Sequence, residues 1–242
     1  REFGEHFSKQ SRQGRQYERF HSWNYSDKYD EVMTIYHQQI HAVDVAVGMI
    51  CEALDKHGVA DNTVVIFTSD HGDMMGDHSL FLKGFMHYRG TLQVPLVIDA
   101  PGMAAGRSRS LASSIDLAPT LLSLCDVTGY DGIQGKDLSP VLLDPGASVR
   151  DYVLIEDDLA EITAKLTPFP ARTRTLITPE YRYTRNSKGE EQLFNLLDDP
   201  DEMRDLKQAN GPARIAALET LTGALMAADD SARGAPAAED YQ

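Results

Sequence analysis

Apolar residues recur every three or four positions over residues 27–57, between polar ones. This spacing places them on one side of a helix and predicts a single long amphipathic helix. Gly58 follows directly, and a glycine in that position commonly ends a helix because it adopts a left-handed conformation. The apolar positions are Val32, Ile35, Tyr36, Ile40, Val43, Val47, Ile50 and Leu54.

Two short apolar runs after this helix predict strands. Residues 63–68 form a continuous, largely β-branched run, which is typical of a strand covered on both faces, as in parallel sheets. Residues 94–98 form the second run, in which Pro95 indicates an edge or a strand start. Residues 116–124 then predict a helix with Asp116 as its N-cap.

The pattern changes near Pro145-Gly146, beyond which short strand candidates are separated by turn signals. We therefore expect an antiparallel meander, a final helix over residues 213–226 and a polar tail over 231–242. The fold class is α/β: part of a mostly parallel sheet with flanking helices over residues 1–145, and a small α+β subdomain over 146–242. The expected meander strands are 152–155, 173–177, 181–184 and 192–194.

Composition narrows the range of partners. The chain has 242 residues, of which 42% are hydrophobic and 25% charged, and its net charge is −14. Nucleic-acid binding requires a basic face, so we expect no nucleic-acid partner. No apolar run reaches the length of a membrane span, and we expect no membrane partner. An anionic substrate would need locally placed cations to offset the acidic whole.

The two cysteines, Cys51 and Cys125, lie in apolar, helix-like surroundings and are expected to be buried thiols. Their separation offers no paired spacing for zinc. Such sparse cysteine usage fits a reducing compartment. A cytoplasmic location is therefore the expectation, with a periplasmic one as the alternative.

The candidate metal ligands are Asp70 and His71, which directly follow the predicted strand 63–68. Ligands in open α/β sheets bind just outside the carboxyl ends of strands, and a carboxylate beside an imidazole suits a divalent cation. The alternative is that Asp70 caps the next turn and His71 is an ordinary loop residue. Gly72 permits a tight turn or a close backbone approach, and Asp73 is expected to cap the following turn.

The candidate catalytic residues are Lys83 and His87. Apolar neighbours should hold Lys83 near buried surface, where its ammonium needs an anion; a sulfate or phosphate oxygen, or a structural carboxylate, would serve. A surface lysine is the alternative. His87 suits a second donor to an anionic group or a proton donor to a leaving oxygen. Asp77 and His78 belong either to the site or only to the shaping of its loop.

In their order along the chain, these residues resemble the sulfatase branch of the alkaline phosphatase superfamily. That branch includes arylsulfatases, choline-sulfatase-like enzymes and phosphonate monoester hydrolases. The resemblance covers residues 27–206, and the joint order of its segments is far more specific than any one of them. The segments are 36–44, 61–63, 68–73, 82–84, 94–96, 115–122, 134–138, 193–196 and 199–202.

The resemblance implies an alkaline-phosphatase-like fold and a small anionic ester as substrate. It makes Asp70 and His71 ligands of a divalent metal, Ca²⁺ or Mn²⁺. It makes Lys83 a contact to the oxygens of the transferred sulfuryl or phosphoryl group, and His87 a further substrate contact. Whether a sulfate, phosphate or phosphonate ester is cleaved stays open.

One family feature does not match this sequence. The family nucleophile lies in a Cys- or Ser-x-Pro-x-Arg motif and is converted to formylglycine, and neither Cys51 nor Cys125 fits that motif. We therefore expect a C-terminal half that is inactive alone, binds metal weakly and packs on an N-terminal half; homo-oligomerisation is left open. The alternatives are a phosphodiesterase or phosphomutase of the same superfamily, and a stand-alone non-catalytic binding domain.

Overall fold

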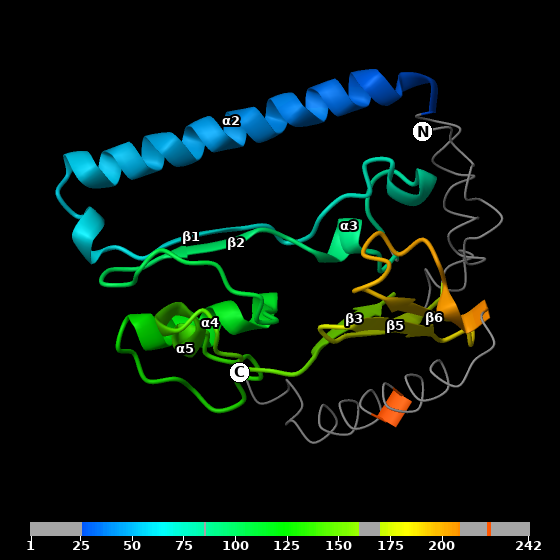
Figure 1. Cartoon of the computed structure of the whole chain (residues 1–242). Helices are drawn as coiled ribbons and strands as arrows, with labels where there is room; N and C mark the ends of the chain where they lie inside the picture. Colours follow the sequence, from blue (N-terminus) through cyan, green and yellow to red (C-terminus); the bar gives the residue numbers. More distant parts are fainter. Residues whose placement is uncertain (1–25, 85, 160–169, 209–221, 224–242) are drawn as a thin grey trace. The chain divides into compact units, whose positions relative to one another are not determined.

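The structure is a computed structural model that describes residues 26–84, 86–159, 170–208 and 222–223 (Figure 1). The chain divides into two compact units, residues 1–103 and residues 104–242. The domain boundary expected between residues 145 and 146 stays a prediction.

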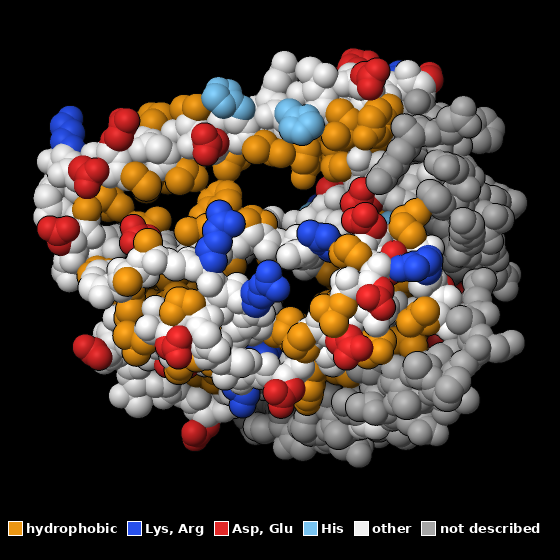
Figure 2. All heavy atoms as spheres, viewed as in Figure 1, with side chains coloured by type: hydrophobic (Ala, Val, Ile, Leu, Met, Phe, Trp, Pro, Cys, Tyr) orange, Lys and Arg blue, Asp and Glu red, His pale blue; other side chains and the backbone are white. Residues whose placement is uncertain are grey.

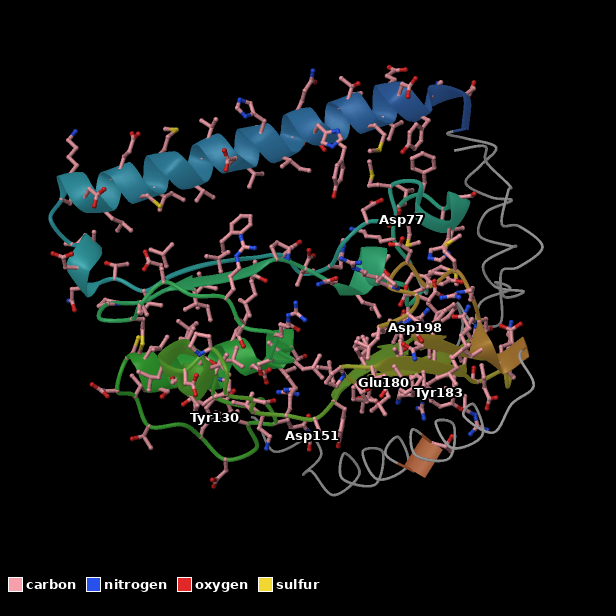
Figure 3. All side chains as sticks on the ribbon, in the orientation of Figure 1. Asp77, Tyr130, Asp151, Glu180, Tyr183 and Asp198 are labelled. Carbon is pink, nitrogen blue, oxygen red and sulfur yellow. The ribbon has the colours of Figure 1, made fainter. Side chains whose placement is uncertain are left out.

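The first unit begins with the predicted long helix. A short 3₁₀ turn, η2 (Ser26–Lys28), leads into helix α2 (Tyr29–Lys56). Gly58 adopts a φ of +65° just past its end, as predicted for a helix-terminating glycine. Helix α2 has no buried residue, and hydrophobic side chains are visible along it in Figure 2 and as sticks in Figure 3. Its apolar side is therefore accessible in this chain.

A two-stranded sheet follows helix α2. Strand β1 (Val65–Thr68) comes after the 3₁₀ turn η3 (Ala60–Asn62), and strand β2 (Leu96–Asp99) starts directly after Pro95. Both strands and the strand-start position of the proline agree with the sequence prediction. The two strands pair antiparallel to each other. Among the described residues of the first unit, this pair is the part of the expected mostly parallel sheet that is present.

The faces of this sheet differ from the expectation of a strand covered on both sides. Phe67 of β1 is 38% exposed and Val97 of β2 is 58% exposed. No residue of β1 or β2 is fully buried. The β-branched run forms a strand as predicted, but the described residues do not bury it, because β2 is its single described partner strand.

The second unit opens with helices. A 3₁₀ turn, η5 (Ser114–Asp116), leads into α4 (Leu117–Leu124), and α5 (Ser139–Leu143) follows. Asp116 takes the N-cap position of α4, as predicted, but its side chain makes no capping hydrogen bond to that helix. The side chain completes a capping box on the preceding turn η5, in which the backbone N–H of the N-cap Ser113 donates to Asp116 Oδ2 at 2.8 Å.

Asp116 instead anchors the surrounding loops. Its side chain is fully buried; Oδ1 accepts the Lys136 backbone N–H at 2.7 Å and pairs with the Arg150 guanidinium. The hydroxyl of the buried Thr120 donates to the Asp116 carbonyl and accepts the Leu138 N–H at 2.9 Å. A buried carboxylate needs such partners to offset its lost hydration.

The predicted antiparallel meander is confirmed. Four strands pair in chain order, each antiparallel to the next. Gly189 adopts a φ of +76° in the turn before the last strand, where a glycine was expected to permit reversal. The strands are β3 (Val153–Asp158), β4 (Arg172–Ile177), β5 (Tyr181–Asn186) and β6 (Glu191–Asn195).

One face of this sheet carries an apolar core. Leu176, Tyr183 and Leu193 come from three adjacent strands and are at most 1% exposed. Leu154, Tyr181 and Leu206 pack against them. Because the core draws on all four strands, the meander closes over side chains of its own unit.

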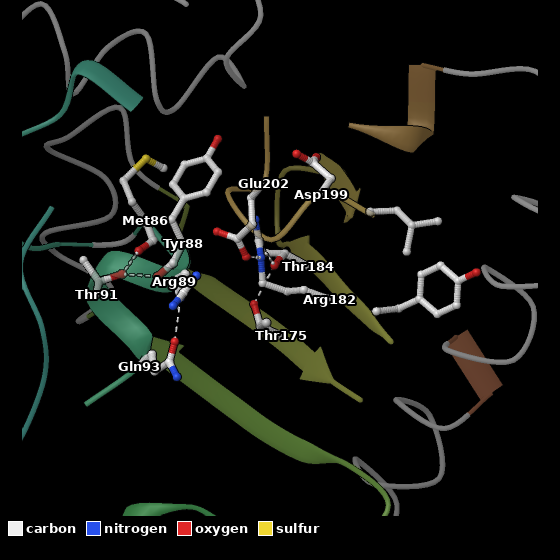
Figure 4. A network of polar contacts seen from close by, with 12 residues as sticks. Met86, Tyr88, Arg89, Thr91, Gln93, Thr175, Arg182, Thr184, Asp199 and Glu202 are labelled. Atoms are coloured by element: carbon white, nitrogen blue, oxygen red, sulfur yellow. Dashed lines mark hydrogen bonds and ion pairs between the residues drawn. The ribbon is translucent and has the colours of Figure 1, made fainter. Parts of the chain in front are cut away.

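The opposite face buries polar side chains in a paired network (Figure 4). Arg182 Nε donates to Glu202 Oε1 at 2.5 Å, and the two side chains are 1% and 2% exposed. Arg182 also donates to the Thr184 hydroxyl at 2.8 Å and lies 4.5 Å from the centre of the Phe194 ring. The Thr184 hydroxyl also bonds that of Thr175 at 2.7 Å. Burial of a charge is tolerated here because the charge is paired.

The prediction that both cysteines are buried is wrong. Cys51 and Cys125 are free and exposed. Cys51 lies on helix α2, which the described chain leaves uncovered, and Cys125 lies at the end of α4.

Other predictions concern residues outside the described part. They are the helix over 213–226, of which residues 222 and 223 alone are described, and the tail over 231–242. Among the described residues, no helix combines the length and the apolar character needed to cross a bilayer.

Candidate functional site

Asp70 lies two residues beyond strand β1 and presents its carboxylate to solvent. Its side chain is 83% exposed. Oδ1 accepts the His71 backbone N–H at 2.9 Å and the Ser69 hydroxyl at 3.3 Å. The His71 N–H bond is the main reason that the pKa of Asp70 lies below its ordinary value. Asp70 is thus an ionised, exposed carboxylate that is held in place locally.

His71 is held in one tautomer by its two neighbours. Nδ1 lies 2.9 Å from the Gly72 carbonyl oxygen, which can only accept, so Nδ1 carries the proton. Nε2 then presents its lone pair, which the Lys83 ammonium contacts at 2.8 Å. Nε2 also lies 3.4 Å from Asp70 Oδ2. An imidazole lone pair therefore faces a carboxylate and an ammonium.

Lys83 is brought to the pair by the loop, across twelve residues of sequence. The expectation that its neighbours hold it near buried surface is wrong, because Lys83 is exposed and its neighbour Leu82 is itself 37% exposed. The structure thus joins Asp70, His71 and Lys83. His87 is 5% exposed and lies between the buried Met86 and Tyr88.

The loop that carries Lys83 has a strained backbone. Four of its non-glycine residues adopt a left-handed φ between 41° and 62°. This conformation costs roughly 1–2 kcal/mol for each such residue. Strain of this kind clusters at functional sites, where the surrounding structure holds it. The four residues are Met75, His78, Ser79 and Leu82.

Apolar packing holds the strained loop. Met74, Leu80 and Phe81 are at most 1% exposed, and the Phe81 ring lies 5.5 Å from that of Tyr29 on helix α2. Two backbone bonds close the loop, from Met74 N–H to the Leu82 carbonyl at 2.9 Å and from Gly76 N–H to the Leu80 carbonyl at 2.7 Å. The packing fixes the direction in which Lys83 leaves the loop.

The remaining polar residues of this segment have local partners. Asp73 Oδ1 accepts the Met75 N–H at 3.0 Å, which is the capping role predicted for it. The His78 ring is buried and stacks on Tyr88 at 4.0 Å, which favours its loop-shaping alternative. Asp77 is exposed in the segment between β1 and α3 (Arg89–Leu92), where Figure 3 labels it.

Gly72 makes the close backbone approach that the sequence allowed. A Cβ at this position would lie 2.0 Å from the Gly90 carbonyl oxygen. The Gly72 N–H donates to the Thr91 carbonyl at 2.9 Å. The sequence analysis did not identify Ser69, which bonds Asp70, or Gly90 and Thr91, which contact Gly72. The one signal in the sequence was that these residues are small and lie near the predicted site.

The donor set fits a divalent cation but is incomplete in the described residues. Asp70 offers a carboxylate, and His71 offers a neutral imidazole whose other nitrogen is held by a carbonyl, as is usual for metal-bound histidines. Within the described part of the chain, no group of three or more His, Cys, Asp or Glu residues is placed to hold a metal. Hard cations such as Ca²⁺ need six or more oxygen ligands.

Two family models match the sequence. The model described as "Sulfatase" matches residues 4–127, and that described as "N-sulphoglucosamine sulphohydrolase, C-terminal" matches residues 76–227. The first covers just over half of the chain and includes the candidate site.

Individual proteins give the same picture. An arylsulfatase of Clostridium perfringens is 32% identical over 177 residues, which are 71% of this chain and 35% of the relative. A choline-sulfatase of Rhizobium meliloti is 31% identical over 76% of this chain and 35% of its own length. The solved phosphonate monoester hydrolase of Agrobacterium radiobacter has a TM-score of 0.70 at 29% identity, over 82% of this chain and 42% of that one. The chain thus spans about a third of the length of these curated relatives.

Proposed function

The chain belongs to the sulfatase family, whose solved members share an alkaline-phosphatase-like fold, and from this premise we propose that it supplies part of the active site of a metal-dependent sulfate-ester hydrolase. The observation that carries the proposal is the His71 lone pair, held beside the exposed Asp70 carboxylate and contacted by Lys83.

Asp70 and His71 are the proposed metal ligands. Asp70 is ionised because its pKa is lowered, and His71 has its lone pair on Nε2 because Nδ1 donates to Gly72. Both groups are therefore in the protonation state that a cation requires. When bound, the metal, Ca²⁺ or Mn²⁺, would act as a Lewis acid toward an ester oxygen.

Lys83 is the proposed contact to the transferred group. The His71 Nε2 lone pair cannot serve both a cation and the Lys83 ammonium, which now donates to it. With that lone pair engaged, Lys83 directs its N–H donors to the oxygens of the anionic ester. Charge that develops on those oxygens in the transition state would be offset by the ammonium.

His87 is proposed to touch the substrate or to give a proton to the leaving oxygen. The imidazole is buried in the segment that leads into α3. Buried histidines are suited to proton transfer because their surroundings fix one orientation.

The nucleophile and the remaining ligands are proposed to lie outside this chain. The relatives are about three times as long as the matched segment, and the exposed apolar sides of α2 and of the β1–β2 pair fit packing against such a remainder. Exposed apolar side chains of this extent commonly mark an interface. They include Ile40, Met49, Ile50, Phe67 and Val97.

Steady-state hydrolysis tests the function. The protein used is the longest continuous reading frame that contains this chain, assayed with an aryl sulfate, choline sulfate, a phosphonate monoester and a phosphodiester. We expect a sulfate ester to be the best substrate. Asp70→Ala should lower turnover on the order of 100-fold or more, since even outer partners of metal ligands cost 10- to 100-fold. Asp61→Ala, which removes an exposed carboxylate of η3, is the control.

The same assay separates the alternatives. Preferred hydrolysis of the phosphonate monoester would favour that branch of the family, to which a structural neighbour belongs. Preferred hydrolysis of the phosphodiester would favour a phosphodiesterase. If none of the four esters is turned over and the cation affinity of Asp70→Ala equals that of the unaltered protein, a non-catalytic binding domain would be favoured.

Lys83→Met tests the role of the lysine separately. Turnover should fall by about 100- to 1,000-fold, as for the loss of a transition-state charge partner. Cation affinity should rise, since the substitution removes a positive charge and the donor that competes for the His71 Nε2 lone pair; repulsion between two unit charges at about 4 Å in water is about 1 kcal/mol, or roughly fivefold in affinity. A parallel loss of cation affinity would contradict the assignment.

A further inference from the structure

Thr91 of α3 forms hydrogen bonds to residues adjacent in sequence to both histidines of the proposed site. Its carbonyl oxygen accepts the Gly72 N–H at 2.9 Å. Thr91 is 6% exposed, and its hydroxyl donates to the Met86 carbonyl at 2.5 Å and lies 3.0 Å from the Tyr88 carbonyl (Figure 4). Those two carbonyls flank His87.

The link between Thr91 and His71 passes through the backbone N–H and the backbone carbonyl of Gly72. The Gly72 carbonyl accepts the His71 Nδ1–H at 2.9 Å, and the Gly72 N–H is fixed by Thr91. No side chain fits at this position, because a Cβ would lie 2.0 Å from the Gly90 carbonyl oxygen. The orientation of Gly72, and with it the tautomer of His71, therefore depends on contact with the first turn of α3.

The link to His87 passes through the carbonyls on either side of it. The Thr91 backbone N–H also donates to the Tyr88 carbonyl at 3.0 Å. The N–H and the hydroxyl of Thr91 therefore both form hydrogen bonds with the segment that contains His87. Carbonyl oxygens buried without a donor are costly. The segment is thereby held against the start of α3.

We propose that Thr91 is a positioning residue, which holds His71 in its Nδ1–H tautomer and keeps His71 and His87 in a fixed register. The inference rests on the proposed function for its catalytic meaning. Its structural content, a hydrogen-bonded path from Thr91 to His71, stands apart from that function. The hydroxyl acts on His71 indirectly: its bonds to the Met86 and Tyr88 carbonyls fix the start of α3, whose Thr91 carbonyl in turn holds the Gly72 N–H. A glycine is required at position 72.

Solution NMR of the whole chain tests the path directly. A through-hydrogen-bond scalar coupling should join Gly72 N to the Thr91 carbonyl carbon. The Gly72 amide should exchange with solvent more slowly than that of Gly102, which lies in an open turn. Absence of the coupling together with fast exchange at Gly72 would overturn the proposal without any substitution.

A matched pair of substitutions tests the effect on His71. Thr91→Val keeps the shape and removes the hydroxyl; Thr91→Ser keeps the hydroxyl. Imidazole ¹⁵N shifts of His71 should show protonated Nδ1 in the unaltered chain and in Thr91→Ser, and a mixture of tautomers in Thr91→Val. Thr120→Val, at a fully buried threonine of the second unit, should lower stability and leave these shifts unchanged.

Turnover completes the test in the longest reading frame. Thr91→Val should lower kcat by 10- to 100-fold with little change in KM, and Thr91→Ser should restore it. Wild-type His71 shifts and kcat in folded Thr91→Val would overturn the inference. If Thr91→Val does not fold, the Gly72–Thr91 coupling and the Thr91→Ser shifts decide. Unchanged cation affinity in Asp70→Ala would reject the proposed function instead.

Discussion

Charged side chains differ in burial between two regions of the molecule. One is the site loop, the segment between β1 and α3 in the first unit, which carries Asp70, His71 and Lys83; the other is the four-stranded sheet of the second unit. On one face of the sheet, Arg182 of β5 and Glu202, which follows β6 in the chain, are nearly fully buried and bonded to each other. In the loop, the Asp70 side chain is 83% exposed and that of His71 is 40% exposed. A charge that is buried and paired contributes to one packed state, whereas an exposed charge on a held backbone stays available to a ligand.

The backbones of the two regions differ in the same sense. Four left-handed non-glycine residues, Met75, His78, Ser79 and Leu82, lie in the site loop, whereas the described strands β3 to β6 contain none. Beside the sheet, Glu202 has a φ of 55°. The strands themselves are thus locally relaxed, and the loop is strained and held by packing. Stability resides in one region and the candidate chemistry in the other.

Breaking the buried pair of the sheet should have the largest effect. Glu202→Ala leaves the Arg182 guanidinium buried without its carboxylate, which should cost about 3–5 kcal/mol of unfolding free energy. Urea unfolding followed by near-ultraviolet circular dichroism measures it. Asp201→Ala, at the exposed neighbouring carboxylate, should change little. A loss below about 1 kcal/mol in Glu202→Ala would show that the pair is not effectively buried.

Relieving strain in the loop should have an opposite and smaller effect. Ser79→Gly and Leu82→Gly should each raise the free energy of unfolding by about 1 kcal/mol, because glycine adopts a positive φ without the steric cost. Ala105→Gly, at an exposed position outside the left-handed set, should lower it instead. Thermal unfolding of the three variants provides the comparison. Destabilisation by both loop substitutions would contradict the account of strain.

The pH response should show the smallest effect. A hydrogen bond from Arg174 is the main reason that the pKa of Asp158 lies below 3.8. A lowered folded-state pKa stabilises the protein above the unfolded value, and this contribution is lost as pH falls through the folded one. Arg174→Met should return the Asp158 pKa toward 3.8, as followed by carboxyl ¹³C shifts.

Two matched comparisons sharpen the pH test. Arg172→Met should shift the Asp158 pKa less, because Arg172 contributes less to its lowering. The pKa of Asp70 should not move in either variant, since the His71 backbone N–H is its main cause. An equal response of Asp70 and Asp158 would show that general charge, and not the local hydrogen bonds, sets both values.

Local signals in the sequence predicted much of this structure. The periodicity of residues 27–57 predicted α2, and the turn signals at Pro179-Glu180 and at residues 186–189 predicted the meander. The adjacency of Asp70 and His71 is a property of the sequence itself, and their place beyond a strand followed from the apolar run. Each of these features depends on neighbours within a few residues.

Contacts across longer separations could not be predicted. The approach of Lys83 to His71 depends on left-handed residues such as Leu82, which propensity would not place there. The contact of Gly72 with Thr91 depends on the packing of α3. The exposure of Cys51 depends on which residues cover α2. The apolar pattern of the helix predicts that one side is covered, but it does not show which residues cover it.

We propose Asp70 and His71 as ligands of a metal centre that the described residues leave incomplete. Isothermal titration of the 242-residue chain with Mn²⁺ and with Ca²⁺ is the decisive experiment for this claim. We predict weak binding, with a Kd of roughly 1 mM, that is lost in Asp70→Ala and in His71→Ala and kept in Asp61→Ala. Micromolar affinity in the unaltered chain, or binding that survives both ligand substitutions, would contradict the claim.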